Sequence, residues 1–260
     1  MPTNPSPKGA PLTPPPIMKS PFFEWLVLGA VLFVSLLFGQ LVTASLMPQL
    51  GILDYGEALQ KAVDTSDPLL VSAFRVFQAV GQFFLFTLPP LLFVGFLYRH
   101  KAARFLHLHR FPPVGVLLLG LLLLILAFPF TQACYWLMSQ LPLPTWMMEQ
   151  GETSRKLVAA FLDMDSTSAL WMNLLAMAVF PAVGEELMFR GVVQKLIGKS
   201  GKNPHRAIWV TAALFSFIHF EALGFVPRLL LGALLGYLLF WTNNLWVPII
   251  AHLAYNASQI

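Results

Sequence analysis

Long apolar runs constrain the fold of this chain more than any other feature of its sequence. Only 11% of the 260 residues are charged, whereas soluble domains carry about 25%. A run of about 20 apolar residues is long enough to cross a bilayer as a helix. The runs therefore predict an all-α, polytopic transmembrane bundle of about seven spans: 22–46, 69–98, 114–137, 168–193, 206–221, 226–242 and 245–260. The fifth and the last are short, which a helix lining the protein interior tolerates.

The charges between the apolar runs predict the orientation. The connection after the first run is mostly acidic, the next holds Arg99, Lys101, Arg104 and Arg110, and the one after the fourth run is purely basic. Basic loops favour the cytoplasmic side, so we expect the N-terminus in the cytoplasm of a bacterial inner (plasma) membrane. Basic residues clustered between spans give no indication of a nucleic-acid partner.

Composition divides the chain into three parts. Residues 1–21 are rich in Pro and Ser, which predicts a disordered cytoplasmic tail. Residues 22–167 hold the first three spans and, at 146–162, a mixed apolar and charged stretch typical of a helix lying on the outer surface. Residues 168–260 hold the last four spans, which we expect to form a core around an intramembrane site.

Three charges inside the fourth apolar run require an explanation. Glu185, Glu186 and Arg190 lie in an otherwise apolar stretch, and a charge at the centre of a membrane helix costs about 2.5–3.5 kcal/mol. Residues four apart share a helix face, so Glu186 and Arg190 should pair. Glu185 has no such partner, which makes it the better candidate for a base that takes a proton from water. Carboxylates at a helix end reaching for lipid headgroups would be the structural alternative.

Two later spans add polar residues at a similar depth. Phe215 and His219, and likewise His252 and Asn256, are four residues apart and share a helix face. Counted from the predicted inner surface, Glu185, His219, His252 and Asn256 lie about 15, 20, 12 and 18 Å deep. Two histidines at the depth of an unpaired glutamate favour a functional site over buried core histidines.

The three motifs, Glu185-Glu186-x-x-x-Arg190, Phe215-x-x-x-His219 and His252-x-x-x-Asn256, resemble in order and spacing those of the CPBP family. This family includes type II CAAX prenyl endopeptidases, Abi proteins and bacteriocin-processing proteins. The resemblance covers about residues 168–260. It implies an intramembrane endopeptidase that cuts near the C-terminus of a peptide or membrane-associated protein substrate.

The resemblance also implies a role for each motif residue. Glu185 would activate the attacking water, His219 would hold that water or a metal, and His252 with Asn256 would stabilise the oxyanion. Glu186, Arg190 and Phe215 would support the site.

The cofactor stays open at this stage. Glu185, His219 and His252 would make a three-ligand zinc site, as in a metalloprotease. However, the His-Glu-x-x-His signature is missing, and the same residues suit a metal-free mechanism.

Two other functions compete with the protease. A non-catalytic immunity protein would use the polar cluster as a binding pocket for bacteriocin-like peptides. A transporter or proton relay would also need intramembrane Glu and His, but it gives no reason for Asn256.

Overall fold

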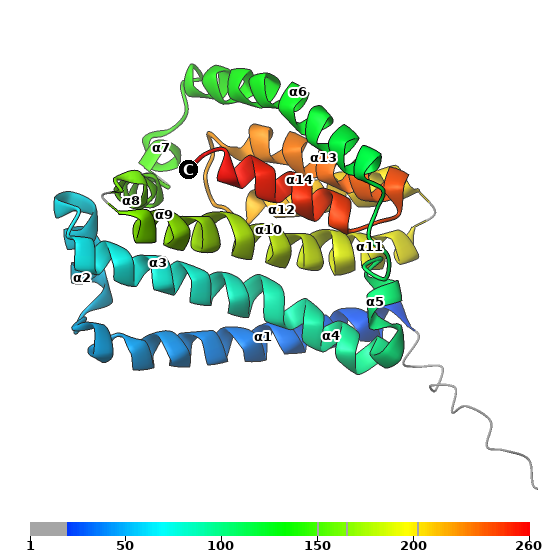
Figure 1. Cartoon of the computed structure of the whole chain (residues 1–260), viewed down its shortest axis with the longest axis horizontal. Helices are drawn as coiled ribbons and strands as arrows, with labels where there is room; N and C mark the ends of the chain where they lie inside the picture. The colour runs from blue at the N-terminus through cyan, green and yellow to red at the C-terminus, as the bar shows by residue number, and fades with distance from the viewer. Residues whose placement is uncertain (1–19, 150, 165, 202) are drawn as a thin grey trace, which may run out of the picture.

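The computed structural model describes residues 20–149, 151–164, 166–201 and 203–260. Within these residues every regular element is a helix, and the helices lie in layers side by side (Figure 1). The predicted polytopic helical bundle is confirmed. Residues 1–19 of the predicted tail, 1–21, lie outside the described residues. The first helix begins at Pro21.

Among the described residues, five helical stretches are long and apolar enough to cross a membrane: Pro21–Leu50, Pro68–Phe105, Val114–Ser139, Thr167–Ser200 and Phe225–Thr242. The other two predicted spans are α12 (Pro204–Phe217) and α14 (Trp246–Ala257), of 14 and 12 residues. They are about 21 and 18 Å long. Helix α12 packs on α13 (Phe225–Thr242), and α14 lies between α6 (Val114–Ser139) and α10 (Phe180–Glu185). The short length of α14 matches a position inside the bundle, since none of its residues is exposed. Helix α12 buries one face and exposes Trp209, Leu214 and Phe217 on the other.

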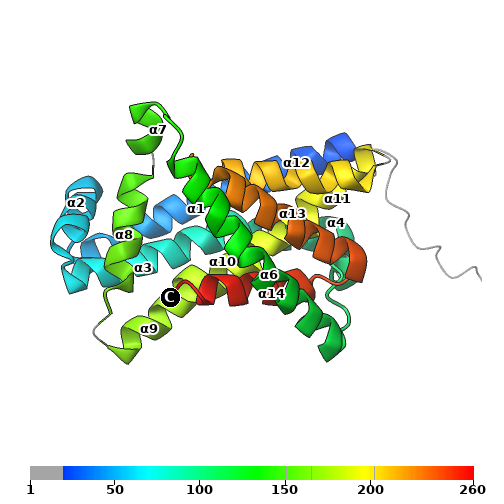
Figure 2. The ribbon, with the colours of Figure 1, turned by 90° about the horizontal axis from the view of Figure 1, so that it is seen from above.

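The distribution of apolar side chains is that of an integral membrane protein. Phe33 and Leu41 on α1 (Pro21–Leu46), and Leu118 and Ile125 on α6, are more than half exposed. Both helices lie at the outside of the bundle (Figures 1 and 2). A soluble protein rarely exposes apolar patches of this extent, so these outer faces suit contact with lipid.

Two of the long spans contain π-helical segments next to a proline. The second span runs through α3 (Pro68–Gln82), the π-helical segment η3 (Phe83–Thr87) and α4 (Leu88–Tyr98). Pro89 and Pro90 lie in the first turn of α4, directly after η3. Because proline has no N–H to donate, the usual helical hydrogen-bond ladder is interrupted there. The chain then continues through the short helices η4 (Arg99–Lys101) and α5 (Ala102–Phe105).

The fourth span carries two π-helical segments. It runs through α9 (Thr167–Asn173), η5 (Leu174–Val179), α10, η6 (Glu186–Val193) and α11 (Gln194–Ser200). Pro181 lies at the start of α10, just after η5. Such widened turns occur frequently at functional sites, and η6 holds Glu186 and Arg190.

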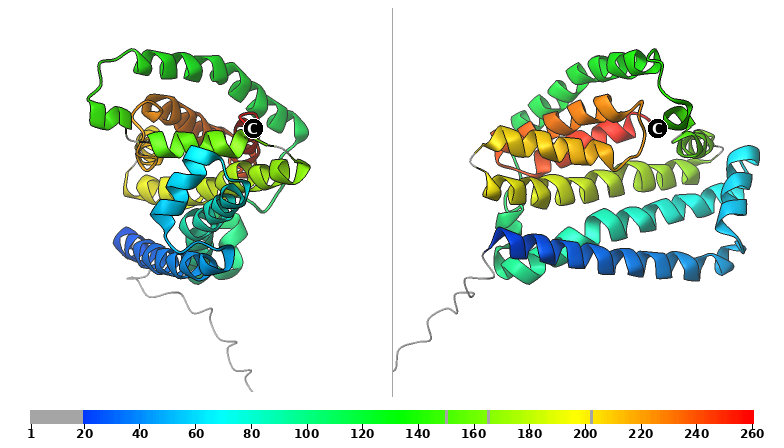
Figure 3. Two further views of the ribbon diagram at one scale, coloured as in Figure 1. Left: turned by 90° about the vertical axis from the view of Figure 1, so that its left-hand side faces the viewer. Right: turned by 180° about the vertical axis from the view of Figure 1, so that it is seen from behind.

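Short helices cover one end of the bundle. The predicted surface helix, 146–162, is observed as α7 (Thr145–Glu149) and α8 (Glu152–Leu162), and Gly151 has a φ of +85° before α8. A further helix, α2 (Tyr55–Thr65), forms in the acidic connection, where Asp54 accepts a hydrogen bond from the backbone N–H of Glu57. Helix α2 packs on α3 and α8 at this end (Figure 3). The long apolar runs do not predict α2, because the sequence of this helix is amphipathic and not uniformly apolar.

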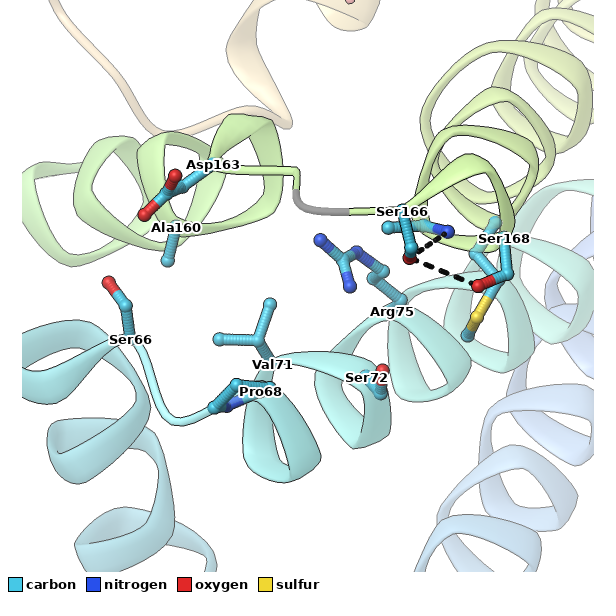
Figure 4. Close-up of a pocket in the computed structure, with 11 residues that line it drawn as sticks. Ser66, Pro68, Val71, Ser72, Arg75, Ala160, Asp163, Ser166 and Ser168 are labelled. Atoms are coloured by element: carbon cyan, nitrogen blue, oxygen red, sulfur yellow. Dashed lines mark hydrogen bonds between the residues drawn. The ribbon is translucent and has the colours of Figure 1, made fainter.

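A buried arginine joins three helices at this end. Arg75 of α3 donates hydrogen bonds to Asn173 Oδ1 of α9 (2.7 Å) and to the Phe161 carbonyl of α8 (2.9 Å). Its side chain reaches into a cavity of about 160 Å³ between α3, α8 and α9 (Figure 4). No residue of α10 or η6 lines this cavity, so it is separate from the polar residues of those two segments.

The last four helices pack closely because small residues face their neighbours. A Cβ atom on Gly232 of α13 would lie 3.1 Å from the Phe215 ring and 3.3 Å from Ala212 Cα on α12. A Cβ atom on Gly236 would lie 2.9 Å from both Ile208 Cγ2 and Gln194 Oε1. This close approach brings the polar residues of α12, α14 and η6 toward one another.

Candidate functional site

Glu186 and Arg190 form a fully buried ion pair on η6. Arg190 Nη1 donates to Glu186 Oε1 over 2.8 Å, and both side chains have 0% exposure. The predicted pairing across one helical turn is therefore observed. The second Arg190 amino group donates to the Gly232 carbonyl over 2.8 Å, and the guanidinium lies 4.7 Å from the centre of the Phe215 ring. Arg190 thus connects η6 to both α12 and α13.

Glu186 also holds His252, a contact that the sequence did not predict. His252 Nδ1 lies 2.9 Å from Glu186 Oε1, and His252 is 3% exposed. An ionised carboxylate only accepts hydrogen bonds, so Nδ1 is the ring nitrogen that carries the proton here. The other nitrogen, Nε2, then has a free lone pair while the ring is neutral. Glu186 therefore fixes both the orientation and the tautomer of His252.

The free nitrogen of His252 faces Glu185. His252 Nε2 and Glu185 Oε2 are 3.9 Å apart, and Glu185 is 4% exposed. This distance is too long for a direct hydrogen bond, but a water molecule can bridge polar groups that are more than 3.5 Å apart. The two adjacent glutamates thus lie on either side of the His252 ring, each near a different nitrogen.

His219 lies at the edge of this group. The predicted helix 206–221 ends at Phe217, because Phe220 adopts a φ of +47° and the chain turns. His219 is consequently in the turn after α12, with an exposed side chain. Its Nδ1 is 2.8 Å from the Phe215 carbonyl, which accepts the hydrogen bond. The Phe215 ring lies 5.2 Å from the His219 ring and 6.0 Å from the His252 ring, between centres, and so contacts both.

Asn256 lies one turn after His252 on α14 and is half-buried. The spacing places both residues on one helix face. The predicted catalytic residues Glu185 and His252 are thus brought together, with His219 beside Phe215 and Asn256 one turn farther along α14.

The second span contributes a residue that we did not predict. The side-chain amide of Gln82, at the end of α3, lies against the carboxyl group of Glu185. The following segment, η3, packs against α10. The signal available in the sequence was a glutamine inside an apolar run, seven residues before a pair of prolines.

A salt-bridge cluster lies next to His219 in the turn between α12 and α13. Glu221 accepts from Arg155 of α8 (3.1 Å) and from Arg228 of α13 (2.7 Å). Burial would raise the pKa of the Glu221 carboxyl, but the hydrogen bonds and charges of Arg228 and Arg155 outweigh it and lower that pKa. The cluster connects the short helix α8 to the turn that carries His219.

A catalytic zinc site is built from three protein ligands that converge on one point. No three His, Cys, Asp or Glu side chains in the described part of the chain converge as a metal-binding group. In the arrangement observed, Glu185, His219 and His252 therefore do not form the three-ligand zinc site. The zinc prediction itself stays a prediction.

Comparisons with known proteins agree with the predicted resemblance. Residues 167–258 match the family described as type II CAAX prenyl endopeptidase Rce1-like. The chain is also 32% identical over 118 residues to "Uncharacterized protein YpbD" of Bacillus subtilis (strain 168). This alignment covers 44% of the chain and 53% of that protein, so the chain spans about half the length of this relative. No solved structure matches. The family resemblance is confirmed for the segment that contains all three motifs.

Proposed function

From the family match over residues 167–258, we propose that this chain is an intramembrane endopeptidase that activates water with Glu185. The observation that supports this most directly is the pairing of His252 Nδ1 with Glu186 (2.9 Å), which leaves Nε2 facing Glu185 Oε2 at 3.9 Å. One water molecule between these two acceptors would donate a hydrogen to each. Its oxygen lone pair would then be free to attack a peptide carbonyl.

The proposed reaction uses only side chains of this chain. Glu185 takes a proton as the water oxygen bonds to the carbonyl carbon, and it returns the proton to the leaving nitrogen as the C–N bond breaks. The products are a carboxylic acid and an amine. The Asn256 amide would donate to the oxyanion of the tetrahedral intermediate, since loss of one such donor typically costs about 10²–10³ in rate. His219 would hold the water or the substrate at the edge of the site.

Burial is what makes this arrangement effective. Glu186 and Arg190 neutralise each other with no exposure, so His252 is held by a carboxylate whose charge is already compensated. A residue positioned by packed, hydrogen-bonded neighbours keeps its geometry when substrate binds. The network of Glu186, Arg190 and Gly232 would therefore orient His252 without taking part in proton transfer.

The substrate that we propose is a peptide or a membrane-associated protein, cut near its C-terminus. It would reach the site within the bilayer, because the site lies among membrane-spanning helices. The chain would reside in a bacterial inner membrane with its N-terminus in the cytoplasm. The site residues give no reason to require a prenyl group on the substrate.

The test is a comparison of the full chain with Glu185→Gln, each purified and incorporated into liposomes with solubilised membrane peptides. Mass spectrometry of new peptide termini should show cleavage products with the unchanged protein. Glu185→Gln should lower their rate of formation by roughly 10²–10⁴, the usual contribution of a general base. The matched control is Glu152→Gln, because Glu152 is half exposed on α8.

The same variants test the alternative, an immunity protein that binds bacteriocin-like peptides. Products that form equally fast with Glu185→Gln would reject the protease. Protection of cells that survives Glu185→Gln would then support binding without catalysis.

A further inference from the structure

We propose that Gln82 is a positioning residue for Glu185, supplied by the second span. This inference rests on the proposed function and adds a residue from outside the family match, which begins at residue 167. The Gln82 amide lies against the Glu185 carboxyl group, while Glu185 Oε2 faces His252 on the other side.

The chemistry of the amide fixes which of its ends faces Glu185. An ionised carboxylate has no hydrogen to donate, so in the proposed contact Gln82 Nε2 donates to it. The other end, Gln82 Oε1, is buried without a hydrogen-bond partner among the described residues. A buried acceptor left unpaired destabilises the folded protein. Such a cost is reasonable at a site where a substrate peptide N–H donates to this oxygen.

The backbone around Gln82 holds it close to the glutamate helix. Gln82 is the last residue of α3, and η3 begins at the next position. On the opposite helix, a Cβ atom on Gly184 would lie 2.6 Å from Thr87 Oγ1 and 3.2 Å from the Phe86 carbonyl carbon. Only glycine at position 184 permits this approach. The residue before Glu185 therefore fixes the distance between the two helices.

Pro89 and Pro90 contribute to the position of Gln82. Each lacks the N–H that an α-helical ladder would use, and the Leu88 N–H bonds to the Phe83 carbonyl, five residues back. The widened turn changes the direction of the side chains that precede it relative to those that follow. A straight α-helix through residues 82–90 would place Gln82 and Phe86 at a different angle to α10.

The expected consequence is a loss of turnover with little loss of substrate affinity. Gln82→Met keeps the length and volume of the side chain but removes the donor. Glu185 would then be free to rotate, and a misplacement of about 1 Å typically costs 10²-fold in rate. We expect kcat for peptide cleavage to fall about 10- to 100-fold while KM changes little.

The control lies on the same helix. Gln78 is one turn before Gln82 on α3 and its side chain is exposed, so Gln78→Met introduces the same change without touching Glu185. It should keep the kcat of the unchanged chain. Gln82→Glu serves as a second variant of the same shape, because an acceptor in place of the donor repels Glu185 and should lower kcat as well.

The full-length variants are purified in detergent, compared by size-exclusion profile and thermal unfolding, and assayed together with Glu185→Gln. Wild-type kcat in folded Gln82→Met or Gln82→Glu would overturn the role of Gln82, while an inactive Glu185→Gln would still support the protease. An equal loss in Gln78→Met would also overturn it, because the effect would then belong to the helix as a whole. If Gln82→Met does not fold, the kcat of Gln82→Glu decides. Cleavage that is unaffected by Glu185→Gln would instead reject the proposed function.

Discussion

Arg190→Met should destabilise this protein far more than a comparable change in an exposed ion pair. The substitution removes the 2.8 Å contact with Glu186 and the 2.8 Å contact with the Gly232 carbonyl. Glu186 would lose its compensating charge at 0% exposure and keep only His252 as a partner. Leaving one member of a buried pair uncompensated costs about 3–5 kcal/mol, so the free energy of unfolding should fall by about that amount.

A double-mutant cycle separates the ion pair from general packing loss. Glu186→Gln alone leaves Arg190 buried and unpaired, so it should cost about as much as Arg190→Met. The double variant contains neither charge and should lose no more stability than either single variant. The coupling energy should therefore be about 3 kcal/mol, at the upper end of the range for contacting residues.

The measurement is reversible unfolding in mixed detergent micelles, followed by tryptophan fluorescence. The matched control is Lys156→Met, since Lys156 and Glu152 have the same four-residue spacing at 3.0 Å but are about half exposed. Its unfolding midpoint should stay unchanged, because exposed pairs contribute little. If the losses of the two single variants simply add in the double variant, to within about 0.5 kcal/mol, Glu186 and Arg190 do not stabilise each other as argued.

Two further predictions concern acid stability and metal content. Arg228 and Arg155 lower the pKa of Glu221, so the stability that Glu221 contributes is present above its unfolded pKa and is lost as the pH falls through its folded pKa. Unfolding midpoints of the unchanged chain should therefore decrease more steeply below about pH 4.5 than those of Glu221→Gln, and parallel curves would contradict this. The metal-free mechanism predicts that cleavage survives dialysis against a chelator, and elemental analysis of the purified protein tests this; one zinc per chain that disappears in His219→Ala would favour the metal site instead.

The spans were predictable because hydropathy and length alone determine which segments can cross a bilayer. The seven predicted helices are all present, and the Glu186–Arg190 pair follows from helix periodicity. Helix α2 was missed because it is amphipathic and short. The end of α12 was placed four residues too late, since the positive φ of Phe220 has no signal in an apolar run.

Contacts between distant segments could not be predicted in the same way. His252 and Glu186 are 66 residues apart, and the depth argument placed His252 in the layer of the site without indicating which glutamate it contacts. Gln82 lies in a span outside the recognised motifs. Hydropathy places this glutamine in an apolar helix, but its partner depends on which helices pack together and at which rotation.

The adjacent glutamates illustrate how one costly feature serves two purposes. Neighbouring residues on a helix point about 100° apart, so Glu185 and Glu186 cannot face the same group. Glu186 is directed toward Arg190, which compensates its charge, and toward His252 of α14, which it fixes. Glu185 is directed toward Gln82 and the free nitrogen of His252. Because Glu186 already determines where His252 lies, Glu185 would remain available for the proposed proton transfer. The two carboxylates cannot exchange their contacts without rotating the helix.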